Sequence, residues 1–198
     1  KIDNVNVTSK MLDSTLGYVQ IRDFSQGVSG NFIDAVNNLQ AQGAKHIVFD
    51  MRNNTGGLAS EVIKMLDYLL PEATIASLKG RKDGKDYTET WTSKKSTGVP
   101  ADMRYAILLN GMSASASELF SGCLRDNDKA WLIGEQSFGK GSGTITIPLS
   151  DGSAINLANF LYYLPDGESI EEVGLTPDQK VTLPDAATGK SLSQLTLE

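Results

Sequence analysis

The stretch from Tyr105 to Phe120 has the sequence YAILLNGMSASASELF and is the clearest guide to the fold. Residues 105–110 are mostly apolar and predict a buried β-strand. Apolar residues at helical spacing follow the serines: Leu119, Phe120, Cys123 and Leu124. The serines therefore lie where a strand turns into a helix, and the free N–H groups of a helix N-terminus favour developing negative charge. A serine in this place is a candidate nucleophile, and it is equally a candidate for an ordinary helix N-cap.

On both sides of this stretch, strand and helix patterns alternate along the chain. Strands are predicted at 17–22, 45–51, 105–110 and 130–133, and helices at 29–42, between Gly57 and Pro71, and at 116–127. This alternation predicts an α/β fold with a mainly parallel sheet and crossover helices. β-Hairpins are added at 74–92 and at 143–163.

We expect a single domain over residues 1–198. Residues 1–14 form an N-terminal segment outside the core, and residues 179–198 form an irregular C-terminal tail.

The composition narrows the class of protein. The chain has 198 residues, 40% of them hydrophobic, and a net charge of −6, which argues against a nucleic-acid-binding surface. Its one cysteine, Cys123, is expected to be a buried small hydrophobe. No apolar run is long enough to cross a bilayer. The sequence shows no cluster of His or Cys residues with metal-ligand spacing, and we expect no metal and no cofactor. Because the sequence starts at Lys1 without Met, we expect a processed or excised fragment.

A serine nucleophile needs a base to accept its proton. The chain has one histidine, His46, which opens a predicted buried strand with no obvious route to the serines, so a Ser-His-Asp triad is not expected. A lysine is the other choice if burial lowers its pKa enough to make it neutral. Lys140 is the candidate, because its flanking glycines allow close approach and Phe138 can help to exclude water. The alternative is a solvated or ion-paired lysine.

Two other motifs overlap the Lys140 segment. Residues 134–140 match the first seven positions of a phosphate-binding P-loop, but Gly141 replaces the expected Ser or Thr, and a β-like stretch follows where a helix belongs. Ser137 and Lys140 match the Ser-x-x-Lys motif of penicillin-binding enzymes, but the glycines disfavour a helix, and a Lys-Thr-Gly partner is missing. We therefore expect no nucleotide as a partner.

The segment Asn53-Asn54-Thr55-Gly56-Gly57 follows a predicted strand and precedes a predicted helix. Glycines leave backbone N–H groups exposed there, as an oxyanion hole requires, although an ordinary tight turn has the same composition.

Taken together, these segments resemble the C-terminal processing peptidases, also called tail-specific proteases, which are Ser-Lys peptidases. The matching segments follow the family's order between about Lys10 and Asp178: 50–57, 113–118, 134–141, 149–153 and 173–178. In that family the nucleophile is the middle serine of a Ser-Ala-Ser-Ala-Ser run, and the lysine lies 25 residues later. Lys140 lies 25 residues after Ser115, so the resemblance implies that Ser115 is the nucleophile and Lys140 the base.

The resemblance also implies roles for neighbouring residues. Ala116 N–H and a glycine of the Gly56-Gly57 pair would form the oxyanion hole, and Glu118 and Asp126 match supporting positions.

Two features differ from the family pattern. The family usually has a Gln four residues after the lysine to orient it, and this chain has Thr144, whose reach is shorter. Most members also carry a PDZ domain before the core, and none is present in this chain.

The resemblance implies a ClpP/crotonase-like core in an extracytoplasmic protein. We expect a serine endopeptidase that cleaves protein substrates near their C-termini through an acyl-enzyme. The alternative is a catalytically impaired peptide-binding or scaffold protein on the same fold.

Overall fold

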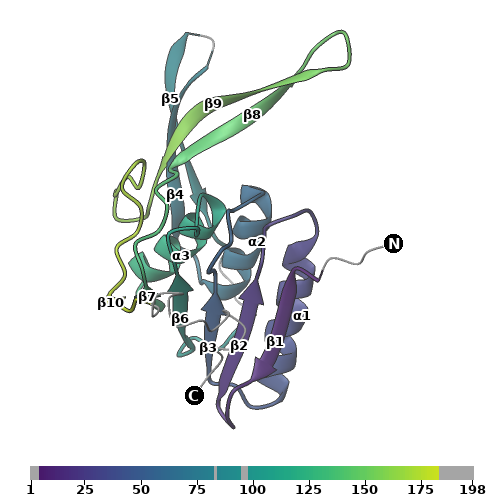
Figure 1. Cartoon of the computed structure of the whole chain (residues 1–198), viewed down its shortest axis with the longest axis vertical. Coiled ribbons are helices and arrows are strands. Elements are labelled where there is room, and N and C mark those ends of the chain that lie inside the picture. Colours follow the sequence, from purple (N-terminus) through teal and green to yellow (C-terminus); the bar gives the residue numbers. More distant parts are fainter. Residues whose placement is uncertain (1–4, 83, 95–97, 183–198) are drawn as a thin grey trace, which may run out of the picture.

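The computed structural model describes residues 5–82, 84–94 and 98–182. Within these residues, six strands form a mainly parallel sheet in the order β1-β2-β3-β6-β7-β10 (Figure 1). Their bounds are β1 Val7–Met11, β2 Leu16–Ile21, β3 His46–Asp50, β6 Arg104–Leu109, β7 Ala130–Gly134 and β10 Gln179–Lys180. Only β1 runs antiparallel to its neighbour, so the expected mainly parallel sheet is confirmed.

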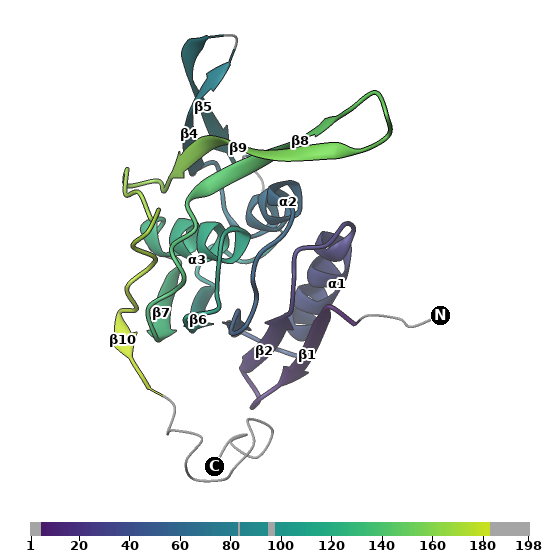
Figure 2. The same ribbon diagram turned by 45° about the horizontal axis from the view of Figure 1, so that its top comes forward.

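Three helices of the described chain pack side by side against this sheet (Figures 1 and 2): α1 Val28–Ala41, α2 Ala59–Leu69 and α3 Ala116–Asp126. Helix α1 contacts β1 and β2, and helix α3 contacts β7. Strands β2, β3 and β6 alternate between fully buried and more exposed residues, because one face of the sheet is covered by the helices. Among the described residues, no helix is both long enough and apolar enough to cross a membrane.

An aromatic cluster fixes α3 to the sheet. The Phe120 ring of α3 packs edge-to-face on Phe49 of β3 and on Phe32 of α1, with ring centroids 5.4 Å and 6.0 Å apart. All three side chains are fully buried. Edge-to-face pairs add about 0.5–1.5 kcal/mol each to the stabilisation from burial alone. The start of α3 is thereby held close to the carboxyl ends of the strands.

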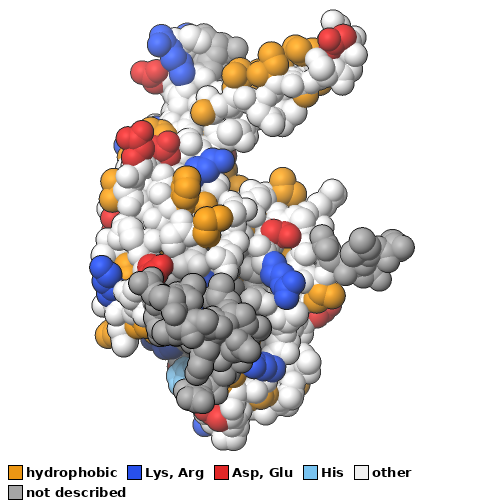
Figure 3. All heavy atoms as spheres, in the orientation of Figure 1, with side chains coloured by type: hydrophobic (Ala, Val, Ile, Leu, Met, Phe, Trp, Pro, Cys, Tyr) orange, Lys and Arg blue, Asp and Glu red, His pale blue; other side chains and the backbone are white. Residues whose placement is uncertain are grey.

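A second, antiparallel sheet has the order β5-β4-β9-β8. It consists of two hairpins, β4 Thr74–Lys82 with β5 Lys85–Thr92, and β8 Ser142–Pro148 with β9 Ala154–Tyr163. Both hairpins project beyond the helices (Figures 1 and 2). The β8–β9 hairpin carries exposed apolar side chains, and Figure 3 shows them along the projecting arm: Ile145, Ile147, Leu149, Ile155 and Leu157.

The two ends of the chain differ from the expectation. The segment 1–14 contributes β1, an edge strand whose Val7 and Met11 pack against the core. Its polar composition reflects the exposed side chains between those two residues. In the tail, β10 pairs in parallel with β7, and a strand of two residues is too short to show a periodic pattern. Residues 1–4 and 183–198 lie outside the described part of the chain.

Candidate active site

Three loops meet at the carboxyl edge of the parallel strands, where α/β sheets usually bind their ligands. They follow β3, β6 and β7 and comprise residues 51–57, 110–115 and 135–141. Ala114 N–H donates to Asn54 O at 3.0 Å, and Phe138 N–H donates to Ser113 O at 2.9 Å. The three candidate segments from the sequence therefore lie side by side.

Ser115 occupies the turn between β6 and α3 in a rare backbone conformation, with φ 56° and ψ −113°. Positive φ costs a residue other than glycine about 1–3 kcal/mol, and such strain is concentrated at functional sites. In other hydrolases a nucleophilic serine also has a strained backbone conformation on a sharp strand-to-helix turn, because this turn exposes the hydroxyl group. The Ser115 side chain is half-buried.

The other two serines of the run are fully buried. Ser113 Oγ–H donates to Met51 O at 2.8 Å, and Ser117 Oγ–H donates to Asn54 O at 2.8 Å. These hydroxyl groups tie the first two loops together and have no open side for a substrate. Ser115 is the serine of the run that solvent can reach.

Glu118 connects the Ser115 turn with the Lys140 loop. This fully buried carboxylate accepts the Ser115 N–H at 2.7 Å and the Lys140 N–H at 2.9 Å on Oε2. Its Oε1 accepts the Gly139 N–H at 2.7 Å and the Ser137 hydroxyl at 2.5 Å. One carboxylate thus joins both candidate catalytic segments, and a supporting role for Glu118 in catalysis stays a prediction.

The Lys140 side chain is exposed. Among the hydrogen bonds of the described residues, none joins Lys140 Nζ to Ser115 Oγ, and none joins it to Thr144. Thr144 lies in β8 opposite Ala158, with its side chain exposed. Phe138 is 63% exposed, so it does not shield the lysine from water in this arrangement. A Ser115–Lys140 pair oriented by Thr144 stays a prediction.

Gly56 packs directly against the nucleophile turn. With φ 102°, it approaches so closely that an added Cβ would lie 2.8 Å from Ala114 O and 3.0 Å from Ser115 Cβ. Its N–H already donates to Asn54 Oδ1 at 2.9 Å. Within the described chain, the N–H groups of Gly57 and Ala116 have no such acceptor. Of the glycine pair, Gly57 therefore has the N–H group that is available to a ligand.

A partly buried ion pair lies at the start of the loop that leads to the glycine turn. Asp50, at the end of β3, accepts Arg52 Nη2 at 2.6 Å, Arg52 Nε at 2.9 Å and the Tyr18 hydroxyl at 2.6 Å. Burial and the hydrogen bond to Asp50 raise the pKa of Tyr18 to about 12, so the hydroxyl keeps its proton and donates. Sequence reasoning included Asp50 and Arg52 in a matching segment but assigned them no role.

Asp126 lies at the far end of α3, about 16 Å from Ser115 along the helix axis. It pairs with Arg125 at 2.8 Å and accepts the Asp166 N–H at 3.3 Å. Burial raises the pKa of its carboxyl. Among the described residues, the hydrogen bonds and ion pairs of Asp126 are to Arg125 and to the turn after β9, not to the Ser115 loops.

Sequence reasoning missed three further residues at the site: Ser137, Tyr162 and Glu171. Ser137 lies in the recognised lysine segment, and its hydroxyl accepts the Leu175 N–H at 2.6 Å. Tyr162 and Glu171 lie after the recognised segment, and neither belongs to a local pattern that marks a site.

The Lys140 loop does not have the properties of a phosphate-binding loop. The N–H groups of Gly139 and Lys140 already bind the Glu118 carboxylate, and the Gly141 N–H binds Glu171 Oε2 at 2.6 Å. Strand β8 follows, not a helix. The loop amides are therefore occupied by carboxylates, which would repel a phosphate.

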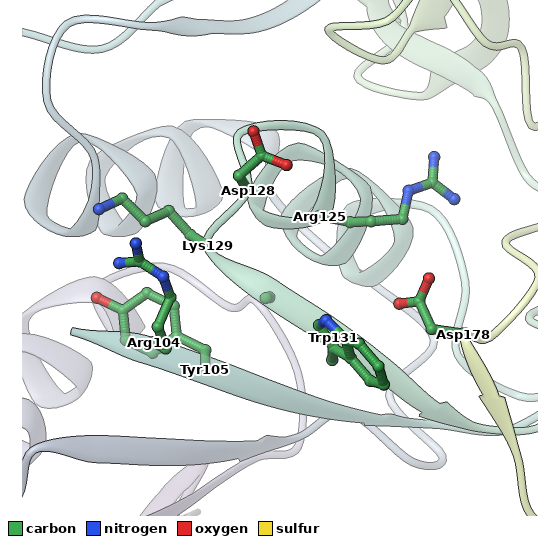
Figure 4. Close-up of a pocket in the computed structure, with 8 residues that line it drawn as sticks. Arg104, Tyr105, Arg125, Asp128, Lys129, Trp131 and Asp178 are labelled. Atoms are coloured by element: carbon green, nitrogen blue, oxygen red, sulfur yellow. The ribbon is translucent and has the colours of Figure 1, made fainter. Parts of the chain in front are cut away.

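A separate pocket of about 450 Å³ lies at the amino ends of β6 and β7, the opposite edge of the sheet (Figure 4). Arg104, Lys129 and Trp131 line it, but Lys129 Nζ donates to Ala101 O at 2.6 Å. His46 is also at this edge, where it opens β3 with an exposed side chain. The pocket contains none of the predicted site residues.

A family model described as Peptidase family S41 matches residues 15–181. The chain is 36% identical over 187 residues to a probable CtpA-like serine protease of Staphylococcus epidermidis, covering 93% of this chain and 38% of that protein. It is 35% identical over 188 residues to a carboxy-terminal-processing protease of Bartonella bacilliformis, covering 92% and 42% of the two chains.

Among solved structures, the photosystem II D1 C-terminal processing protease is similar, with a TM-score of 0.79 and 26% identity. The match covers 92% of this chain and 50% of that one. The chain thus spans at most half the length of these three proteins.

Proposed function

Because this chain belongs to peptidase family S41, we propose that it is the catalytic core of a serine endopeptidase that acts through Ser115 and Lys140. The substrates are proteins or peptides, cut near their C-termini, as the names of the two processing proteases suggest for those proteins.

In the proposed reaction, Ser115 Oγ attacks the scissile carbonyl while neutral Lys140 Nζ accepts its proton. Lys140 then delivers this proton to the leaving amine. The Ala116 and Gly57 N–H groups donate to the tetrahedral oxyanion, where charge develops at the N-terminus of α3. Water hydrolyses the acyl-enzyme, with Lys140 again as base, and Ser115 is regenerated.

The observation that carries this proposal is the sharing of Glu118 between the two segments. Its Oε2 accepts the Ser115 and Lys140 N–H groups at 2.7 Å and 2.9 Å, so the main chains of both residues are held at the same carboxylate oxygen. Since Nζ and Oγ are not hydrogen-bonded, we take the described arrangement as a resting one. The Lys140 side chain must then turn inward toward Ser115 when a substrate binds.

Exposed apolar side chains on the same loops, or directly beside them, suit a peptide substrate. They are Leu58, Met112 and Phe138, which are 46%, 52% and 63% exposed. A peptide that covers them would bury apolar area and exclude water from Lys140 at the same time.

The test is covalent labelling of Ser115 by a serine-reactive fluorophosphonate, followed by mass spectrometry of the modified peptide. We expect labelling in the wild type and in Lys85→Ala, which removes an exposed lysine from the β4–β5 hairpin. Ser115→Ala and Lys140→Ala should both lose labelling and also lose cleavage of an unfolded protein. Near-full activity of Lys140→Ala would refute the dyad.

The second candidate function is a peptide-binding or scaffold protein without catalysis. The open Ser115–Lys140 pair and the exposed Thr144 favour it. It predicts that the wild type binds peptides but neither cleaves them nor reacts at Ser115.

Two further proposals come from the family. The core belongs to the ClpP/crotonase type, and the full-length protein acts outside the cytoplasm, with a PDZ domain that presents the substrate's C-terminus.

A further inference from the structure

Tyr162, near the end of β9, touches both candidate catalytic segments. Its hydroxyl lies 3.0 Å from Ser115 O and 2.9 Å from Lys140 O. Its main-chain N–H donates to Gly141 O at 2.9 Å, so the residue is tied to the lysine loop at two points. The side chain is only 5% exposed.

The hydroxyl has one proton, which lies between the two carbonyl oxygens and is shared by them. Burial and the nearby Glu118 carboxylate raise the pKa of Tyr162 well above its usual value, so the proton stays on the oxygen. Ser115 O also accepts the Glu118 and Leu119 N–H groups of the first helical turn. Lys140 O has no other donor among the described residues, so the hydroxyl is the group that holds this carbonyl.

Glu118 and Tyr162 both bind the main chain of Ser115 and Lys140, Glu118 at the N–H groups and Tyr162 at the carbonyl groups. Glu118 accepts the N–H groups of Ser115 and Lys140, and Tyr162 donates to their carbonyls. Removing the hydroxyl leaves two partially negative carbonyl oxygens facing each other without a shared proton. They would move apart, and a shift of about 1 Å at a catalytic pair can lower a rate about 100-fold.

We propose that Tyr162 is a positioning residue, whose hydroxyl sets the separation of Ser115 and Lys140 through their main-chain carbonyls. This inference rests on the proposed function, because it assigns these two residues to the reaction. Tyr162 itself does not touch the substrate. Since β9 continues into the projecting β8–β9 hairpin, this contact also links that arm with the reactive serine (Figure 1).

The experiment compares Tyr162→Phe with Tyr163→Phe in the whole chain. Both changes remove one hydroxyl, but the Tyr163 hydroxyl has no hydrogen bond among the described residues, and its ring faces Lys79 Nζ at 4.1 Å. The probe is an alkyl fluorophosphonate, with the maximal rate of Ser115 modification and the half-saturating concentration measured separately. Amide hydrogen exchange of residues 115–118 and 139–142 gives a readout that does not depend on activity.

In Tyr162→Phe we expect the maximal rate of modification to fall about ten-fold or more, which corresponds to the loss of one hydrogen bond. The half-saturating concentration should change less than about two-fold, since the probe's binding contacts remain. Amide exchange should accelerate in both segments, and Tyr163→Phe should match the wild type in every readout.

An unchanged rate in Tyr162→Phe, or a variant that no longer folds, would overturn the positioning role. If the wild type does not react at Ser115, the proposed function fails and the catalytic positioning role fails with it. Amide exchange then decides only whether the Tyr162 hydroxyl holds the two segments together. Faster amide exchange of both segments in Tyr162→Phe than in the wild type supports this contact. Unchanged exchange shows that the hydroxyl does not hold the segments.

Discussion

Replacement of Glu118 by Gln tests the central contact of the site, because the change keeps the size of the side chain and removes its charge. The carboxylate has four donors around it, with two on each oxygen. An amide can accept on only one side. The NH₂ group of Gln is best placed where Oε1 of Glu118 was, because the Ser137 hydroxyl can turn and accept from it. In that place the NH₂ group also faces the Gly139 N–H, and two donors cannot bond to each other.

The expected loss follows from these four bonds. Hydrogen bonds to charged groups contribute about 1.5–3 kcal/mol, and neutral ones about 0.5–1.5 kcal/mol. Losing the Gly139 bond and weakening the other three lowers the free energy of unfolding by about 3–6 kcal/mol. For a chain of this length, that is a fall in Tm of about 6–24 °C.

The assay is urea unfolding followed by circular dichroism, together with the rate of Ser115 labelling. The matched control is Glu168→Gln, which breaks an exposed ion pair with Arg125 at 2.6 Å. Exposed pairs contribute about 0–1 kcal/mol, so this variant should stay close to wild type in both readouts. The reasoning is refuted if Glu118→Gln costs less than about 1 kcal/mol and labels Ser115 at the wild-type rate.

Three more outcomes follow from the same structure. Gly56→Ala should lower the free energy of unfolding by about 2–4 kcal/mol and abolish labelling of Ser115, since the added Cβ would lie 2.8 Å from a main-chain oxygen. The control Gly152→Ala, with φ 87° and open space around the added Cβ, should lower it by only about 1 kcal/mol. Ser115→Gly should raise the free energy of unfolding by about 1 kcal/mol by relieving positive φ, whereas Ser115→Ala keeps the strain and should give no such gain. The hydrogen bond from Lys64 lowers the pKa of Glu61 to about 2 from 4.5, so its stabilising contribution is complete above about pH 4.5 and is lost as the pH falls toward 2. The stability difference between wild type and Glu61→Gln should shrink across that window in acid unfolding curves, and a constant difference would contradict this.

The helices and parallel strands could be predicted because their patterns are local. Helix α1 was expected at 29–42 and spans Val28–Ala41, since its apolar residues recur every three or four positions. Strands β1 and β10 could not be predicted in this way. The first is an exposed edge strand with a polar sequence, and the second has only two residues, whose pairing with β7 depends on a contact 46 residues away.

Some features of the candidate site could likewise be predicted from the sequence, and others could not. The resemblance to the processing peptidases implied Ser115 and Lys140, and Ser115 is the one solvent-accessible serine of its run in the described chain. Nothing in the local pattern distinguished Gly57 from Gly56. That distinction depends on the Asn54 side chain, which occupies the Gly56 N–H.

The sequence by itself determined the order of the helices and of the strands from β2 to β9, because short-range periodicity carries that information. The resemblance carried by its motifs implied the family and the two residues proposed for the chemistry. Only the tertiary structure decided how those residues are held. Glu118 reaches the Lys140 loop across 22 residues, and Tyr162 reaches Ser115 across 47. Such hydrogen bonds form only after the sheet and α3 have packed, so no local pattern predicts them.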